Sequence, residues 1–322
     1  MPSEFSDIRV QDLKLLLPLA LVIAAGLRRE RYRPHGGLFA RQRWTYGDVI
    51  LVLAVLTATA FFDPLLNRLA LTPIALLALG FFLQVVLVMS TIYWLLRSKY
   101  KLPTSVLGFD KDVLYNIAWP FAVIFAVISL VGILWSLLLF IDRPVAQLMT
   151  LPGPPRPGSR LEALGLPSSS ALPTALLYYL DVMLLMPITE EVLFRGFAYT
   201  PFTRRFGRRN AAIFTAVLWS LVHPLTFPRT AIITVAGLLY AYLYQRTESL
   251  LPSLSFHTAG NTVITLGWLL SDLEHADRLV LPATAGSCVL FVLCRSLYAR
   301  TKPAAPAGRL LPPEESGESL RP

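Results

Sequence analysis

The sequence predicts an all-α fold, a polytopic transmembrane helical bundle with about eight or nine spans. Of its 322 residues, 55% are hydrophobic and only 15% are charged, whereas soluble domains carry about 25% charged residues. Segments 71–96 and 113–141 contain no charged residue. Each is long enough to cross the hydrocarbon core, which takes about 20 helical residues. A soluble core could hide one such helix, so their repetition indicates a membrane protein.

Nine apolar segments are predicted to be the spans. The first is short, and the fifth is too long for one crossing unless its last turns emerge into the cytoplasm. The aromatic residues Trp44, Tyr46, Tyr93 and Trp94 are expected in the membrane interface, where tryptophan and tyrosine are enriched. The segments are 13–28, 48–65, 71–96, 113–141, 171–204, 209–226, 229–246, 252–270 and 280–298.

Arginine and lysine gather in alternate loops between these segments. They concentrate in 28–46, 97–112, 204–209 and the C-terminal end, while the intervening loops have few bases. Cytoplasmic loops of membrane proteins are rich in basic residues, so we expect a multi-pass protein of the cytoplasmic (inner) membrane with its C-terminus in the cytoplasm. The same distribution explains the net charge of +9 without a nucleic-acid partner.

A Pro-rich segment separates two groups of helices. It contains Leu-Pro-Gly-Pro-Pro-Arg-Pro-Gly, which excludes regular helix and sheet. We therefore divide the chain into N-terminal transmembrane helices at 1–141, a non-cytoplasmic loop at 142–170, a C-terminal core at 171–298 and a disordered cytoplasmic tail at 299–322.

Three segments of the C-terminal core carry polar groups inside apolar sequence. Ionisable residues at membrane depth cost roughly 2.5–3.5 kcal/mol each on insertion scales and mark functional sites by default. In each segment two of these residues are four positions apart, which places them on one face of a helix. The motifs are Glu190-Glu191-x-x-x-Arg195, Trp219-x-x-x-His223 and His257-x-x-x-Asn261.

The spacing of the first two motifs predicts how their groups meet. An ion pair between Glu191 and Arg195 leaves Glu190, about 100° further round the helix, facing the bundle interior. Glu190 and His223 are equally far in sequence from the turn at 206–207. In antiparallel helices they are therefore predicted to lie at the same depth.

The third motif reaches the same region from the next loop on the basic side. A carboxylate and an imidazole at equal depth, here Glu190 and His223, can activate a water molecule. A second imidazole and an amide, here His257 and Asn261, can then donate hydrogen bonds to an oxyanion. The residues alone therefore point to hydrolysis.

Together the three motifs resemble the signature of an intramembrane protease family. It comprises the type II CAAX prenyl proteases and their bacterial relatives, the CAAX protease and bacteriocin-processing (CPBP, Abi) family. The resemblance covers about 171–298; each motif alone is a weak signal, but all three in order on separate apolar segments are specific. The sequence departs from the family at Trp219, where Phe is usual, a change expected to alter pocket shape rather than chemistry.

The resemblance implies an endopeptidase that cleaves a membrane-associated protein or peptide, in CAAX-type or C-terminal sorting-signal processing. It implies that Glu190 and His223 activate the water, while His257 and Asn261 stabilise the oxyanion. The predicted catalytic residues are Glu190, Glu191, His223, His257 and Asn261, with Arg195 and Trp219 in support.

Other interpretations of the same residues stay open. A zinc-dependent version of the protease would use Glu190, His223 and His257 as ligands. However, the sequence has no His-Glu-x-x-His helix and Asn is an uncommon zinc ligand, so we expect no metal cofactor. A non-catalytic scaffold or bacteriocin self-immunity factor could keep these groups for folding or binding, and transporters also have polar sites at mid-membrane. The expected partners are a membrane-anchored protein or peptide and the bilayer.

Overall fold

A computed structural model shows that the described parts of the chain are mainly helical, which confirms the all-α part of the predicted fold class. It describes residues 20–23, 37–59, 66, 71, 73–109, 112–141, 180–223, 227–270 and 280–302, and no β-strand occurs in these ranges. The loop 142–170, most of the predicted span 13–28 and most of the tail 299–322 lie outside the described residues.

Long helices alternate with short 3-10 and π-helical turns. The bounds of α6 are those predicted from sequence, and α12, α13 and α14 agree with their predicted spans to within a turn. The N-terminal elements are α2 (Gly37–Arg41), α3 (Tyr46–Thr59), α5 (Pro73–Trp94), η2 (Leu95–Lys99), η3 (Thr104–Leu107) and α6 (Val113–Ile141). The C-terminal elements are η4 (Asp181–Leu185), α10 (Met186–Glu191), η5 (Val192–Ala198), α11 (Tyr199–Leu221), α12 (Phe227–Thr247), α13 (Leu250–Leu270) and α14 (Val280–Thr301).

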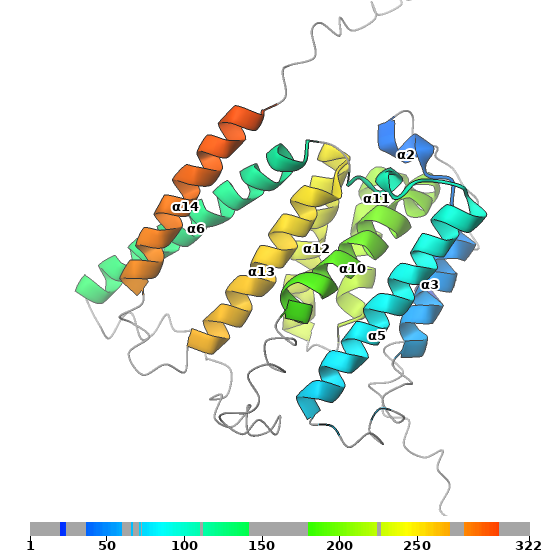
Figure 1. Cartoon of the computed structure of the whole chain (residues 1–322), viewed down its shortest axis with the longest axis horizontal. Helices are drawn as coiled ribbons and strands as arrows, with labels where there is room; N and C mark the ends of the chain where they lie inside the picture. The colour runs from blue at the N-terminus through cyan, green and yellow to red at the C-terminus, as the bar shows by residue number, and fades with distance from the viewer. Residues whose placement is uncertain are drawn as a thin grey trace, which may run out of the picture.

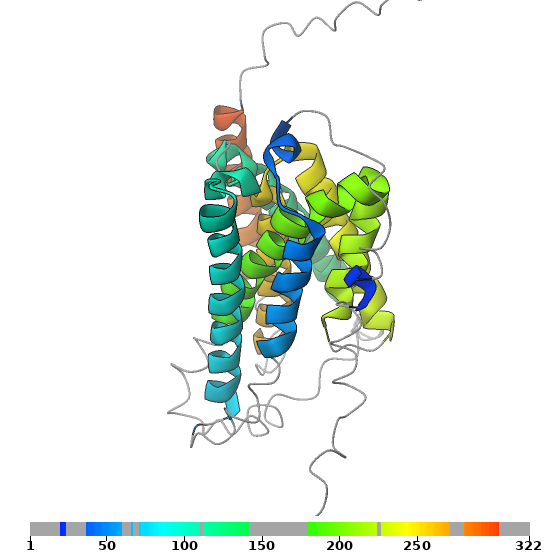
Figure 2. The same cartoon turned by 90° about the vertical axis from the view of Figure 1, so that its right-hand side faces the viewer.

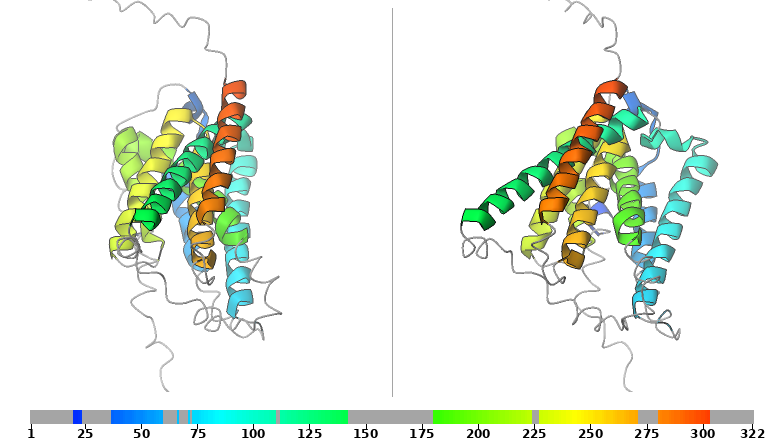
Figure 3. Two further views of the ribbon diagram at one scale, coloured as in Figure 1. Left: turned by 90° about the vertical axis from the view of Figure 1, so that its left-hand side faces the viewer. Right: turned by 60° about the vertical axis from the view of Figure 1, so that its left-hand side comes forward.

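The N-terminal helices flank the motif-bearing helices on two sides. On one side α3 packs on α5, and α5 packs on α10 (Figures 1 and 2). On the other side α6 packs on α13 and runs along α14 (Figure 3). In Figure 1, α2, the start of α6 and the end of α14 all lie at the upper end of the bundle. The basic regions attached to these elements therefore gather at one end, as the loop pattern predicted.

Three helices in the described ranges are long and apolar enough to cross a membrane. They are Leu79–Lys99, Val113–Leu134 and Leu281–Thr301, and a shorter apolar helix covers Tyr46–Thr59. These helices support a membrane protein, and the count of eight or nine spans stays a prediction.

A turn within α11 joins the first two motifs into a hairpin. Gly207 has φ 79° and ψ 165°, so the segment assigned to α11 is two helices joined at this residue. Glycine adopts a positive φ without the steric cost that a Cβ imposes. Phe202 and Phe214 pack across the turn with ring centroids 4.6 Å apart. The turn predicted at 206–207 is confirmed.

The expectation that Trp44 and Tyr46 lie in the membrane interface is wrong. The Trp44 side chain is fully buried, its indole N–H donates to the Phe197 carbonyl at 2.5 Å, and the two rings stack at 5.0 Å. Tyr46 is 8% exposed, whereas Tyr93 and Trp94 are 57% and 54% exposed, as the interface requires. The segment before α3 therefore packs into the bundle.

Small and hydroxylated residues line the contact between α6 and α14. The hydroxyl oxygens of Ser129 and Ser287 lie 2.9 Å apart. One turn further along, Gly132 faces Thr284 so closely that a Cβ at position 132 would overlap the threonine side chain. Small residues let membrane helices approach closely, and this contact holds α14 against the bundle.

Gly132→Ala is expected to destabilise the protein because its new Cβ overlaps Thr284. Overpacking of this kind costs about 1–3 kcal/mol and should lower the midpoint of thermal unfolding in detergent. Gly286→Ala in α14 is the control, since a Cβ there meets nothing within 4 Å. Equal midpoints for the two variants would contradict the close contact.

Candidate active site

The first motif lies on a short α-helical segment between two wider turns. α10 carries both glutamates and is flanked by the π-helical turns η4 and η5, a form of helix that is frequent at functional sites. In η4 the Met186 N–H bonds to the carbonyl of Asp181, five residues earlier. The next residue, Pro187, has no N–H. The Val182 carbonyl therefore lacks a donor from its own helix in this register.

Asn261 supplies the missing donor from α13. Its Nδ2 donates to the Val182 carbonyl at 2.9 Å. An amide nitrogen carries two N–H groups, and the second makes no hydrogen bond to a described residue. The contact with η4 thus holds the amide in place and leaves one donor for a ligand.

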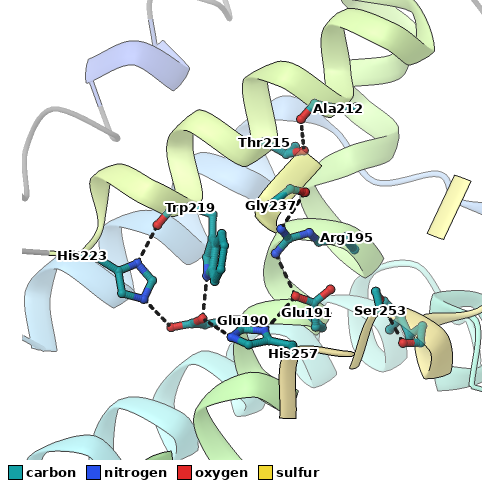
Figure 4. A network of polar contacts seen from close by, with 11 residues as sticks. Glu190, Glu191, Arg195, Ala212, Thr215, Trp219, His223, Gly237, Ser253 and His257 are labelled. Carbon is teal, nitrogen blue, oxygen red and sulfur yellow. Dashed lines mark hydrogen bonds and ion pairs between the residues drawn. The ribbon is translucent and has the colours of Figure 1, made fainter. Parts of the chain in front are cut away.

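A buried ionic chain links the first and third motifs (Figure 4). The Arg195 Nη1 donates to Glu191 Oε1 at 2.9 Å, and His257 Nδ1 lies 3.0 Å from the same oxygen. Arg195 Nη2 also donates to the Gly237 carbonyl of α12 at 3.1 Å. The side chains of Glu191 and Arg195 are 1% and 0% exposed. The predicted ion pair is present, and it ties together α10, η5, α12 and α13.

Glu190 faces the other ring systems of the site (Figure 4). Its Oε2 accepts a hydrogen bond from the Trp219 indole N–H at 2.5 Å and lies 3.5 Å from His257 Nε2. Its Oε1 lies 3.7 Å from His223 Nε2. The side chains of Glu190 and His223 are 12% and 28% exposed, so this part of the site is more accessible than the Glu191 side.

The backbone sets the orientation of His223. Its Nδ1 lies 2.8 Å from the Trp219 carbonyl, which can only accept, so this nitrogen carries a proton. In the neutral ring, Nε2 then presents its lone pair on the Glu190 side. The 3.7 Å separation from Glu190 exceeds a hydrogen bond. A water molecule about 2.8 Å from both atoms would complete a triangle with them.

Trp219 makes a polar contact in addition to shaping the pocket, and the expectation that it leaves the chemistry unchanged stays a prediction. Its indole N–H donates to Glu190, an interaction that the phenylalanine usual in the resembling family has no donor to make. The tryptophan therefore orients the accessible carboxylate as well as filling space beside it.

Tyr240 on α12 is a site residue that the motifs do not include. Its ring stacks on His257 with centroids 5.0 Å apart, while Trp219 meets the same imidazole edge-on at 5.0 Å. The Arg195 Cζ lies 4.9 Å and 5.4 Å from the two aromatic centroids, within cation–π range. Gly237 admits this packing, since a Cβ there would lie 2.9 Å from the Trp219 ring. In the sequence, the only sign of this role was that Gly237 and Tyr240 are three residues apart and so share a helix face. Apolar helices contain many such pairs, so this spacing alone could not identify Tyr240.

The zinc alternative rests on Glu190, His223 and His257 as ligands. No group of three or more His, Cys, Asp or Glu side chains in the described ranges is placed to hold an ion. Glu190, the central ligand of the zinc alternative, already accepts the Trp219 N–H at Oε2. Zinc sites need three or four protein ligands in tetrahedral geometry, and the expectation of no metal cofactor stays a prediction.

Asn261→Leu should destabilise the protein by about 1 kcal/mol, because the Val182 carbonyl loses its donor. The readout is thermal unfolding in detergent. Thr262→Val is the control, since its hydroxyl bonds only to the Thr258 carbonyl of the same helix. An Asn261 variant as stable as the control would show that the contact with η4 contributes nothing to folding.

Arg195→Met should cost about 3 kcal/mol or more, because it leaves Glu191 charged and buried without its main partner. Adding Glu191→Gln removes the second charge, so the double variant should lose less stability than the two single variants together. The exposed Arg209→Met should change the free energy of unfolding by less than about 0.5 kcal/mol. Strict additivity in this cycle would rule out the ion pair.

Comparison with known proteins identifies the family of this region. Residues 172–263 match the family model described as type II CAAX prenyl endopeptidase Rce1-like. No curated protein and no solved structure gives a significant match to the chain. The matched segment contains all three motifs and less than half of the sequence. The resemblance predicted from the motifs is thereby confirmed: residues 172–263 are similar to the Rce1-like type II CAAX prenyl endopeptidases.

Proposed function

We propose that this protein is an intramembrane endopeptidase that hydrolyses a peptide bond of a membrane-associated protein or peptide. The observation that carries the proposal is the environment of Glu190. This carboxylate is partly exposed and faces His223 and His257, while its neighbour Glu191 is buried and paired with Arg195. If both glutamates had only a structural role, nothing would require one to be accessible beside two histidines while the other is buried in an ion pair. The Rce1-like match supports the same class of reaction.

The attacking water is proposed to lie between Glu190 and His223. Glu190 Oε1 and His223 Nε2 can both accept hydrogen bonds from one water, which directs a lone pair at the substrate carbonyl carbon. Glu190 takes a proton as the new C–O bond forms. It returns that proton to the amide nitrogen as the C–N bond breaks, leaving a carboxylic acid, which keeps the second proton of the water, and an amine at the new chain ends.

The oxyanion of the tetrahedral intermediate is proposed to lie between His257 and Asn261. His257 is held at Nδ1 by Glu191, which leaves Nε2 on the side of Glu190. Nε2 donates to the oxyanion when the ring carries both protons. The second N–H of Asn261 is the other donor, held in place by the contact with Val182. Donors fixed before the reaction stabilise developing charge without reorganising.

This chemistry is proposed to proceed without a metal ion, through glutamic-type activation of the water. The substrate is proposed to be a membrane-anchored protein or peptide, processed at a CAAX-type sequence or a C-terminal sorting signal. The basic regions at one end of the bundle support an orientation with that end in the cytoplasm. The proposed location is the cytoplasmic (inner) membrane.

Glu190→Gln should abolish processing, with a loss of about 100-fold or more, because general-base catalysis contributes about 10²–10⁴-fold. The native gene is deleted, and either the wild-type or the variant gene is then re-introduced. The measurement compares the C-termini of membrane proteins between these two kinds of cell. Glu248→Gln is the matched control, since it makes the same chemical change outside the site.

The variant must first be shown to insert and unfold like the wild type. A stable Glu190→Gln protein that processes its substrate normally would contradict the proposed function and favour a scaffold or immunity factor. In the same assay, loss of wild-type cleavage with a zinc chelator, restored by zinc, would contradict the metal-free mechanism.

A further inference from the structure

A groove lies on the face of the α6–α14 pair, and none of its lining residues belongs to the candidate active site. Its volume is about 480 Å³ and its lining is mostly apolar. Pockets that hold small ligands typically measure about 300–1,000 Å³. Ala122 and Ala126 stand one turn apart along the groove among larger side chains, so their small size leaves room for a ligand.

The surroundings of the groove indicate contact with lipid. On α6, Val127 and Leu130 are 53% and 57% exposed; on α14, Val292 and Leu293 are 61% and 59% exposed. Both helices are long and apolar enough to cross a membrane. An exposed apolar face of this extent is typical of a surface that meets a membrane or a partner.

One cation lies among the residues that line the groove. Arg295 is exposed, makes no ion pair with a described residue, and has its guanidinium 5.8 Å from the centroid of the Tyr298 ring. Tyr298 stacks on Tyr115 at 5.0 Å, near the start of α6. Arg295 lies six residues before the end of α14, or about 9 Å along the helix, so its side chain can extend to the headgroup region.

We propose that this groove binds an anionic phospholipid from the leaflet at the basic end of the bundle. Its phosphate pairs with Arg295, and the hydroxyl groups of Tyr115 and Tyr298 lie near that position. One acyl chain lies along α6. From Tyr115 to Leu130 the helix rises about 22 Å. One leaflet of the hydrocarbon core is about 15 Å thick, so the groove can accommodate a chain through its own leaflet.

The position of the groove connects it to the third motif. Trp119 lines the groove and also packs against Phe256 of α13 at 5.9 Å, and Phe256 directly precedes His257. A bound lipid therefore stabilises α6 at its contact with the helix that carries His257 and Asn261. The lipid site stands on the geometry of α6 and α14 and does not depend on protease activity.

The test uses the full chain, purified in a neutral detergent and incubated with phosphatidylglycerol or phosphatidylcholine of the same acyl composition. Native mass spectrometry counts the retained lipids, and thermal unfolding measures the stabilisation they give. We expect the wild type to prefer phosphatidylglycerol about fivefold, which is what one interfacial arginine supplies. Arg295→Gln should abolish this preference, and Arg300→Gln, an exposed residue outside the groove, should retain it.

Ala126→Phe tests the acyl part of the site, because a larger side chain fills the groove. It should lower the retention of both lipids. A phosphatidylglycerol preference that survives Arg295→Gln would overturn the proposal, and so would unchanged retention in Ala126→Phe. A wild-type dimer that dissociates in Ala126→Phe, with lipid retention unchanged, would assign the groove to a second copy of the chain instead.

Discussion

The arrangement of the site depends on how Glu191 is neutralised. A carboxylate buried among apolar helices is tolerated only with a partner, because removing one member of a buried pair costs several kcal/mol. Arg195 and His257 both contact its Oε1, from η5 and from α13. The same requirement that keeps Glu191 charged therefore fixes how closely these elements pack. Arg195 extends the constraint to α12 through the Gly237 carbonyl.

The irregular helical segment around α10 is arranged around the paired Glu191. Adjacent residues of a helix point about 100° apart, yet Glu190 and Glu191 face the two nitrogens of one imidazole. They do so because His257 lies between the two directions, clamped by the Trp219 and Tyr240 rings. The neighbouring π-helical turn frees a backbone carbonyl that α13 satisfies. The continuous segment of η4 and α10 thus contacts α13 both through a backbone carbonyl and through its glutamates.

Sequence reasoning succeeded where one helix or one turn sets the geometry. The Glu191–Arg195 pair follows from helical spacing, and the approach of Glu190 to His223 follows from a hairpin at Gly207. Sequence reasoning missed contacts between separate helices, such as that of Tyr240 with His257. These contacts depend on how each helix is rotated about its axis, and small side chains set that rotation. Sequence reasoning also misplaced Trp44, since an irregular segment that folds back into the bundle carries no periodic signal.

Trp219 fixes the orientation of the accessible carboxylate in this site. A carboxylate free to rotate presents its two oxygens to His223 and His257 interchangeably. The indole N–H removes that freedom, because it holds Oε2 at 2.5 Å and leaves Oε1 on the side of His223. The carboxylate is then oriented before any substrate arrives, and preorganised polar groups need no rearrangement during the reaction. The indole is fixed in turn by Gly237 and by Arg195 across its face. The buried arginine that neutralises Glu191 therefore also packs against the indole that orients Glu190.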